Sequence, residues 1–132
     1  MNILTPFEYF RPETLDEALE LLATKENAKV LAGGTDLVVQ LKEKMIHPAN
    51  VIDITRIPEL NEFKVEDGKG AVIGACTTDA FCEFSAELKA KYPAFAYAAG
   101  EIGGPQVREM GTIGGNLSNS GPSAETPASL IC

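Results

Sequence analysis

The chain has 132 residues, of which 45% are hydrophobic and 23% charged, and its formal net charge is −8. This composition is typical of one globular domain or two closely packed subdomains, and it argues against a disordered chain. The acidic balance and the scattered basic residues argue against binding to nucleic acid or to an anionic membrane surface. No apolar run is long enough for a transmembrane helix, and residues 1–6 lack the basic and apolar regions of a signal peptide.

The three cysteines, Cys76, Cys82 and Cys132, are odd in number and contain no C-x-x-C motif. Free thiols in a reducing compartment are favoured over a disulfide, so we expect a cytoplasmic protein. Zinc and iron–sulfur sites need about four ligands, which these cysteines cannot supply. The only histidine, His47, is predicted to lie on the surface beside Pro48, and no metal site is expected.

Residues 7–57 alternate between strand and helix patterns. Residues 7–10 are extended and aromatic, and Thr14 with Glu17 forms a capping box that opens a helix over residues 15–24. A strand over residues 29–32 runs into a Gly-Gly pair, and an apolar stripe at positions 37, 38, 41 and 45 predicts a second helix. Residues 51–54 form the next strand. This order predicts a small α/β subdomain over residues 1–57.

The pattern changes from residue 58 onward. Two apolar runs flank Asp-Gly-Lys-Gly at residues 67–70, which indicates a β-hairpin, and Thr77 or Thr78 caps the helix that follows. Helices are also predicted over the alanine-rich residues 94–99, after Pro105, and after Thr126, which is expected to be the cap with Pro127 as the first helical residue. We therefore expect an α+β subdomain over residues 58–132. Its predicted core includes the aromatic residues Phe81, Phe84, Tyr92, Phe95 and Tyr97. The last helix reaches Cys132 after barely one turn, so we expect the chain to be truncated or completed by another chain.

Two stretches share a Gly-Gly pair beside hydroxyl and short polar side chains: Ala-Gly-Gly-Thr-Asp at residues 32–36 and Thr-Ile-Gly-Gly-Asn at residues 112–116. Glycine lets the backbone turn tightly and approach a ligand, and neighbouring N–H groups bind anions. Either pair alone is equally consistent with a tight turn, and the P-loop and G-x-G-x-x-G patterns are absent. Together, the two stretches predict loops that hold one phosphate-rich ligand from two sides.

Polar residues near these loops allow alternative roles. Asp36 either caps the following helix or orients neighbouring donors and meets a ribose hydroxyl. Asn116 is a short amide that suits a contact with a phosphate or another polar group of such a ligand. Arg108 either neutralises phosphate charge or pairs with Glu101 or Glu109 on the surface.

Taken in order, four stretches resemble the flavin-binding subunit of the molybdenum hydroxylases, which include xanthine, carbon monoxide and nicotinate dehydrogenases and hydroxybenzoyl-CoA reductase. They are Val-Leu-Ala-Gly-Gly-Thr-Asp-Leu at residues 30–37, Ile-Asp-Ile and Arg-Ile-Pro-Glu-Leu within residues 52–60, Ile-Gly-Ala-Cys-Thr-Thr at residues 73–78, and Gly-Pro-Gln-Val-Arg through Thr-Ile-Gly-Gly-Asn at residues 104–116. Their order and spacing agree over essentially the whole chain. The resemblance implies an α+β fold of the vanillyl-alcohol-oxidase type, with FAD between a small α/β subdomain and the start of a larger α+β subdomain. This sequence would cover roughly the first half of such a subunit.

The resemblance also implies which residues bind the cofactor. The first FAD loop consists of Val30, Leu31, Ala32, Gly33, Gly34, Thr35, Asp36 and Leu37, and the second of Thr112, Ile113, Gly114, Gly115 and Asn116. Ile102 falls where the family has an apolar residue near the flavin. Glu125 falls where relatives usually have an aspartate near the ribose or phosphate, so a contact there involves a side chain longer by one methylene. The absence of a cysteine cluster argues against the hydroxybenzoyl-CoA branch, which carries an iron–sulfur insertion.

By the same resemblance, the chain is an electron-transfer subunit. A molybdopterin-binding large subunit hydroxylates a substrate, and electrons pass through [2Fe-2S] clusters in a small subunit to FAD and then to NAD or another acceptor. The flavin does the redox chemistry and the protein supplies orientation, which agrees with a sequence that contains no nucleophile–base pair, so no catalytic residue is predicted. The alternative is a nucleotide-binding or scaffolding module without redox activity.

Overall fold

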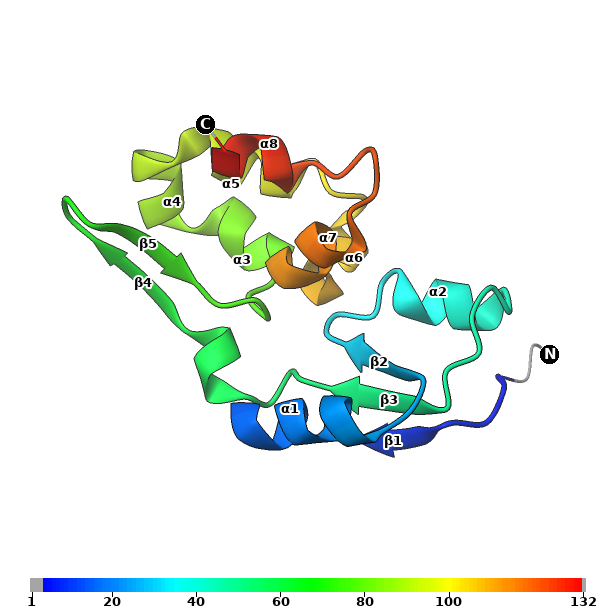
Figure 1. The fold of residues 1–132 in the computed structure, drawn as a ribbon. Coiled ribbons are helices and arrows are strands. Elements are labelled where there is room, and N and C mark those ends of the chain that lie inside the picture. The colour runs from blue at the N-terminus through cyan, green and yellow to red at the C-terminus, as the bar shows by residue number, and fades with distance from the viewer. Residues whose placement is uncertain (1–3, 132) are drawn as a thin grey trace.

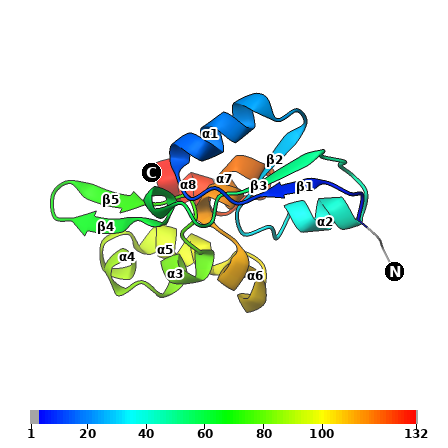
Figure 2. The same cartoon turned by 90° about the horizontal axis from the view of Figure 1, so that it is seen from below.

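The first part of the chain is a three-stranded parallel sheet, seen in a computed structural model that describes residues 4–131. The strands β1 (Glu8–Phe10), β2 (Ala28–Leu31) and β3 (Asn50–Asp53) lie in the order β1-β3-β2. Helix α1 (Leu15–Thr24) connects β1 to β2, and α2 (Leu37–Lys42) connects β2 to β3. The two helices lie on opposite sides of the strands (Figures 1 and 2), as right-handed crossovers in this strand order require. The predicted alternation of strands and helices is confirmed.

Helix α1 begins where the capping pattern predicts. The Thr14 hydroxyl accepts a hydrogen bond from the Glu17 N–H at 3.2 Å, and the Glu17 carboxylate accepts one from the Glu13 N–H at 3.2 Å. The second bond involves the residue before the cap, one position earlier than in a standard capping box. Ala18 is buried, whereas Leu19 is 54% exposed, so the described part of the chain covers the apolar stripe of α1 only in part.

The second part of the chain is a hairpin followed by helices. A short 3-10 helix (Pro58–Asn61) leads into the antiparallel strands β4 (Phe63–Glu66) and β5 (Gly70–Ile73), as the hairpin pattern predicts. The helices are α3 (Asp79–Phe84), α4 (Ala86–Lys91), α5 (Pro93–Gly100), α6 (Pro105–Met110), α7 (Ile113–Asn119) and α8 (Thr126–Ile131). Figure 1 shows them gathered on the side of the molecule opposite α1 and β1. The division into domains at residues 57 and 58 stays a prediction, and Cys132 lies outside the described residues.

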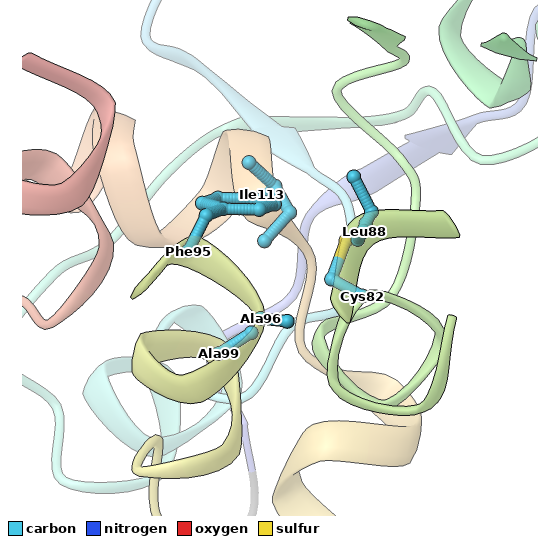
Figure 3. Packing of buried hydrophobic residues seen from close by; sticks show 6 residues of the cluster. All are labelled: Cys82, Leu88, Phe95, Ala96, Ala99 and Ile113. Carbon is cyan, nitrogen blue, oxygen red and sulfur yellow. The ribbon is translucent and has the colours of Figure 1, made fainter. Parts of the chain in front are cut away.

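The main core cluster lies among these helices (Figure 3). It consists of Cys82, Leu88, Phe95, Ala96, Ala99 and Ile113, with Phe63, Val65 and Ile73 of the hairpin packed against it. The prediction that Phe84 and Tyr97 belong to the core is wrong, because they are 67% and 71% exposed. Phe81 and Tyr92 are also largely outside it, at 45% and 37% exposure. The phase of each helix decides this: α3 turns Cys82 inward and α5 turns Phe95, Ala96 and Ala99 inward, which leaves their neighbours outside.

The carboxyl end of β3 is held by a hydrogen-bonded aspartate. The Thr55 N–H and hydroxyl donate to Asp53 Oδ1 at 2.9 and 2.6 Å, the Tyr9 hydroxyl donates to Oδ2, and Arg11 Nε lies 3.3 Å from Oδ2. Burial alone would raise the pKa of Asp53, but the hydrogen bonds from Thr55 and Tyr9 and the charge of Arg11 outweigh it and keep the pKa below its usual value. This network therefore favours the charged carboxylate.

Candidate functional site

A cleft of about 730 Å³ lies between the β2–α2 connection on one side and the segments around α6, α7 and the α7–α8 connection on the other. This volume is within the range of roughly 300–1,000 Å³ found for ligand and cofactor pockets. Most of the predicted cofactor-binding residues line it: Val30, Ala32, Gly33, Gly34, Thr35, Asp36, Leu37, Ile102, Thr112, Gly114, Gly115, Asn116 and Glu125. The structure does not bring Leu31 and Ile113 into this wall. Ile113 belongs to the core cluster, and the Leu31 side chain lies beneath Gly34.

The first wall of the cleft is the 33–36 turn between β2 and α2. Gly34 has φ +74°, a left-handed conformation that favours glycine. The turn uses its carbonyl groups for folding, since Gly34 O accepts from Val38 N at 2.9 Å and Asp36 O accepts from Gln40 N at 3.0 Å. Within residues 4–131, the N–H groups of Gly34, Thr35 and Asp36 donate to no protein acceptor. They are available to an anionic ligand in the cleft.

Gly33 has a different role in the fold. A Cβ at this position would overlap the carbonyl oxygen of Met110 and lie 2.9 Å from the Gly111 Cα. Glycine at position 33 therefore lets the backbone of the first wall touch the backbone at the end of α6. The two walls of the cleft meet at this contact. The fold therefore requires glycine at position 33 whether or not a ligand is bound.

The second wall is the start of a helix, so the prediction of a loop over residues 112–116 is wrong. Thr112 caps α7, and its hydroxyl accepts from Gly115 N at 3.1 Å. Ile113 N donates to Thr77 O at 3.0 Å and Gly114 N donates to Ala75 O at 2.8 Å. The first N–H groups of α7 are thus already bonded within the protein. This wall offers a ligand space rather than main-chain donors.

The two adjacent glycines of α7 differ in what surrounds them. A Cβ at Gly114 would lie 2.6 Å from Ala75 O and 2.7 Å from Ala75 Cβ, so this glycine is needed for packing. Outside the backbone of α7 itself, a Cβ at Gly115 would have a single neighbour within 4 Å, Thr112 Oγ1 at 3.0 Å. Because Gly115 also lines the cleft, its missing side chain leaves room there. A side chain at position 115, unlike one at position 114, would therefore take up space that a ligand in the cleft could use.

Asn116 is oriented by residues of the α7–α8 connection. Its Nδ2 donates to Glu125 Oε2 at 3.3 Å, and the Thr126 hydroxyl donates to Asn116 Oδ1 at 2.5 Å. Thr126 was predicted to cap α8, but it is the first residue of that helix, is fully buried, and holds the Asn116 amide. Because this hydrogen bond joins positions 116 and 126, ten residues apart, no helix- or turn-spacing pattern in the sequence predicts it. Asn116 and Glu125 therefore act on the cleft as one hydrogen-bonded unit.

Arg108 and Asp36 do not make the contacts within the protein that were predicted for them. Arg108 pairs neither with Glu101 nor with Glu109; its Nε lies 2.7 Å from Glu83 Oε2, and its Nη1 donates to Ile102 O and Gly103 O at 3.1 and 2.8 Å. Arg108 is outside the cleft wall and fixes the 102–103 segment beside it. Asp36 occupies the cap position of α2, but its side chain makes no cap hydrogen bond.

Asp79, the first residue of α3, lines the cleft and was not predicted from the sequence. It is only 1% exposed, and within the described chain its Oδ1 has no hydrogen-bond partner. Burial, and next the charge of Glu125, raise its pKa to about 6, while the charge of Arg108 opposes this. The charges that shift its pKa come from α6 and the α7–α8 connection, and its carboxylate lies against Gly111 at the end of α6, so no local motif could have revealed this environment.

The charge of the cleft wall is mainly negative. Asp36, Asp79 and Glu125 line it, and Lys29 is the one cationic side chain among the described lining residues. Over residues 4–131 there is no group of three His, Cys, Asp or Glu side chains that could hold a metal ion. The same part of the chain contains no helix that is long and apolar enough to cross a membrane.

Comparisons with known proteins define the class. The family described as "FAD binding domain in molybdopterin dehydrogenase" matches residues 5–132. The chain belongs to this family, which confirms the family resemblance. The solved carbon monoxide dehydrogenase from Hydrogenophaga pseudoflava superposes with a TM-score of 0.90 at 41% identity, over 96% of this chain and 44% of that one. Quinoline 2-oxidoreductase from Pseudomonas putida 86 gives a TM-score of 0.89 at 26% identity, over 95% and 44%. The predicted α+β fold is therefore confirmed.

Particular relatives are similar over the same stretch. The chain is 42% identical to the carbon monoxide dehydrogenase medium chain of Hydrogenophaga pseudoflava, over 95% of this chain and 44% of the relative. It is 40% identical to the nicotinate dehydrogenase FAD-subunit of Eubacterium barkeri, over 86% and 39%, and 36% identical to the xanthine dehydrogenase FAD-binding subunit of Escherichia coli O157:H7, over 89% and 40%. The chain thus spans less than half the length of the curated relatives it matches.

Proposed function

We propose that this chain binds FAD in the cleft as the flavin-carrying, electron-transfer subunit of a molybdenum hydroxylase complex. The observation that carries this proposal is the 33–36 turn, whose N–H groups of Gly34, Thr35 and Asp36 point to no protein acceptor beside a cleft of dinucleotide size. Family membership supplies the identity of the ligand, because the family is an FAD-binding one. The fifteen predicted contact residues stay a prediction.

The residues of the cleft fit an FAD pyrophosphate, but on one wall more than on the other. The turn offers free main-chain donors, and Lys29 adds the one positive side chain among the described lining residues. The α7 wall accommodates the ligand through the missing side chain of Gly115, and the Asn116–Glu125 unit presents polar atoms to a hydroxyl or phosphate group. Because three carboxylates share the cleft, phosphate binding depends on the turn and Lys29.

The flavin, when bound, supplies the redox chemistry, and the protein supplies its binding and orientation. In the finer form of the proposal, electrons come from [2Fe-2S] clusters in a small partner subunit that serves a molybdopterin-binding large subunit. They leave toward NAD or another acceptor. The names of the relatives support this, since they include the medium chain of carbon monoxide dehydrogenase. A cytoplasmic location is proposed as well.

The test is cofactor identification on the purified chain. We expect flavin absorption bands that dithionite bleaches, FAD rather than FMN after denaturation, and a stoichiometry near one per chain after titration with FAD. A colourless protein that ignores added FAD would refute the proposal. Binding of ADP without binding of FAD would favour the alternative, a nucleotide-binding module without redox activity.

A further inference from the structure

The side chain of Asp79 is an unexplained feature of the cleft. It is 1% exposed, and within the described residues no hydrogen bond reaches its Oδ1. Gly111 leaves room for it, since a Cβ at Gly111 would lie 2.4 Å from Asp79 Oδ2 and displace the carboxylate. A buried carboxylate without a partner is costly, so a structural role alone does not account for it.

The usual structural role for such a residue is to stabilise the start of a helix. Asp79 is the first residue of α3, but Thr78 provides the cap, accepting from Phe81 N at 3.2 Å. The N–H of Asp79 itself donates to Gly111 O at 3.0 Å. The Asp79 carboxylate accepts none of these bonds, so the start of α3 does not use it. What remains is that it lines the cleft.

The charged groups around Asp79 come from each neighbouring element. Glu125 faces it from the α7–α8 connection and raises its pKa, and Arg108 faces it from α6 and lowers it. On its own helix, the buried thiol of Cys82 has a pKa raised to about 12, by burial first and by Asp79 second, and is neutral. Arg108 forms its ion pair with Glu83 at 2.7 Å, and among residues 4–131 no ion pair to Asp79 is found.

We propose that Asp79 is part of the ligand site and takes up a proton from the solvent when an anionic dinucleotide binds in the cleft. This inference rests on the proposed function. The pyrophosphate brings two negative charges to a wall that already carries Asp36, Asp79 and Glu125. Among these carboxylates, Glu125 is bonded to Asn116 and Asp36 is exposed to solvent. Asp79 is buried, and within residues 4–131 its carboxylate has no hydrogen bond or ion pair to lose when it is protonated. Protonating Asp79 therefore reduces the repulsion between the carboxylates and the pyrophosphate without the loss of either kind of contact.

The sign of the pH dependence follows from linkage. Free Asp79 has a pKa of about 6, and a bound anion raises it further. Ligand affinity is then highest when Asp79 is protonated and falls as the pH rises through these values. For an increase of one pKa unit on binding, affinity falls by roughly five- to tenfold between about pH 5.5 and 8.5.

The experiment is calorimetric titration of the purified chain with FAD between about pH 5.5 and 8.5, repeated near neutral pH in PIPES and in imidazole, two phosphate-free buffers that differ in ionisation enthalpy. We expect the wild-type protein to take up protons near neutral pH and to bind more weakly as the pH rises. In Asp79→Asn, both effects should disappear and affinity at high pH should exceed that of the wild type. Glu109→Gln removes the same charge from an exposed position of α6 and should behave as the wild type.

The outcomes separate this inference from the proposed function. FAD binding without proton uptake by the wild type would overturn the role of Asp79 and leave FAD binding intact. Proton uptake that persists in a folded Asp79→Asn variant would assign the proton to another group and would also overturn it. Absence of FAD binding at every pH would overturn both proposals. If the variant does not fold, as judged by circular dichroism, an absence of proton uptake by the wild type in the two buffers still overturns the role of Asp79.

Discussion

Replacing Gly115 with Ala should separate ligand binding from folding. Gly115 lies in the first helical turn of α7, where Ala is favoured over Gly by about 0.5–1 kcal/mol. The new Cβ would meet Thr112 Oγ1 at 3.0 Å, which offsets part of that gain. We therefore expect the free energy of unfolding to stay within about 0.5 kcal/mol of the wild-type value, as measured by urea denaturation.

The same methyl group should weaken FAD binding, because it would enter space on the cleft side of α7. Inserting a methyl group into a packed contact costs about 1–3 kcal/mol, which corresponds to a rise in Kd of roughly five- to 150-fold. Quenching of FAD fluorescence on titration would measure this.

The neighbouring glycine provides the control. In Gly114→Ala the Cβ would lie 2.6 Å from Ala75 O, so the variant should lose about 1–3 kcal/mol of stability. If Gly115→Ala folds and binds FAD as tightly as the wild type, α7 does not contact the ligand and the reasoning fails.

Three further substitutions test the fold around the cleft. Gly33→Ala should destabilise the protein by about 1–3 kcal/mol because its Cβ overlaps Met110 O, and an unchanged urea midpoint would show that the two walls do not touch. Asp53→Ala should cost about 1.5–3 kcal/mol at neutral pH. Since the folded state lowers the pKa of Asp53, its contribution is present above the unfolded pKa and is lost as the pH falls below about 4, so wild type and variant should converge there in acid denaturation. Thr126→Val should lose about 1–2 kcal/mol by releasing the Asn116 amide, and a variant as stable as the wild type would contradict that hydrogen bond.

Elements with local signals could be predicted closely from the sequence. The bounds of α1 agree with the prediction of residues 15–24, because the Thr14 cap and the apolar spacing are both contained in that stretch. The hairpin was predictable for the same reason, since Asp-Gly-Lys-Gly favours a turn between two apolar runs. The turn that forms the first cleft wall was predictable because the strand and the Gly-Gly pair are adjacent in the sequence.

Features that depend on distant residues could not be predicted. A Gly-Gly pair has low helix propensity, yet residues 113–119 are helical because Thr77 O and Ala75 O accept the first N–H groups of α7. The partner of Arg108 is Glu83, 25 residues earlier, rather than a neighbour in sequence. The room for the Asp79 carboxylate is left by the missing side chain of Gly111, which no spacing rule reveals.

The unequal use of main-chain donors on the two cleft walls has a dynamic consequence. On the α7 wall, the N–H groups of Ile113, Gly114 and Gly115 are bonded within the protein, so their exchange with deuterium is already slowed before any ligand arrives. On the other wall, the N–H groups of Gly34, Thr35 and Asp36 have no protein acceptor within residues 4–131 and should exchange quickly. A bound phosphate would slow exchange on that wall alone. The turn is therefore the side of the cleft whose N–H groups become protected on binding, while α7 is the preformed surface against which the ligand is held.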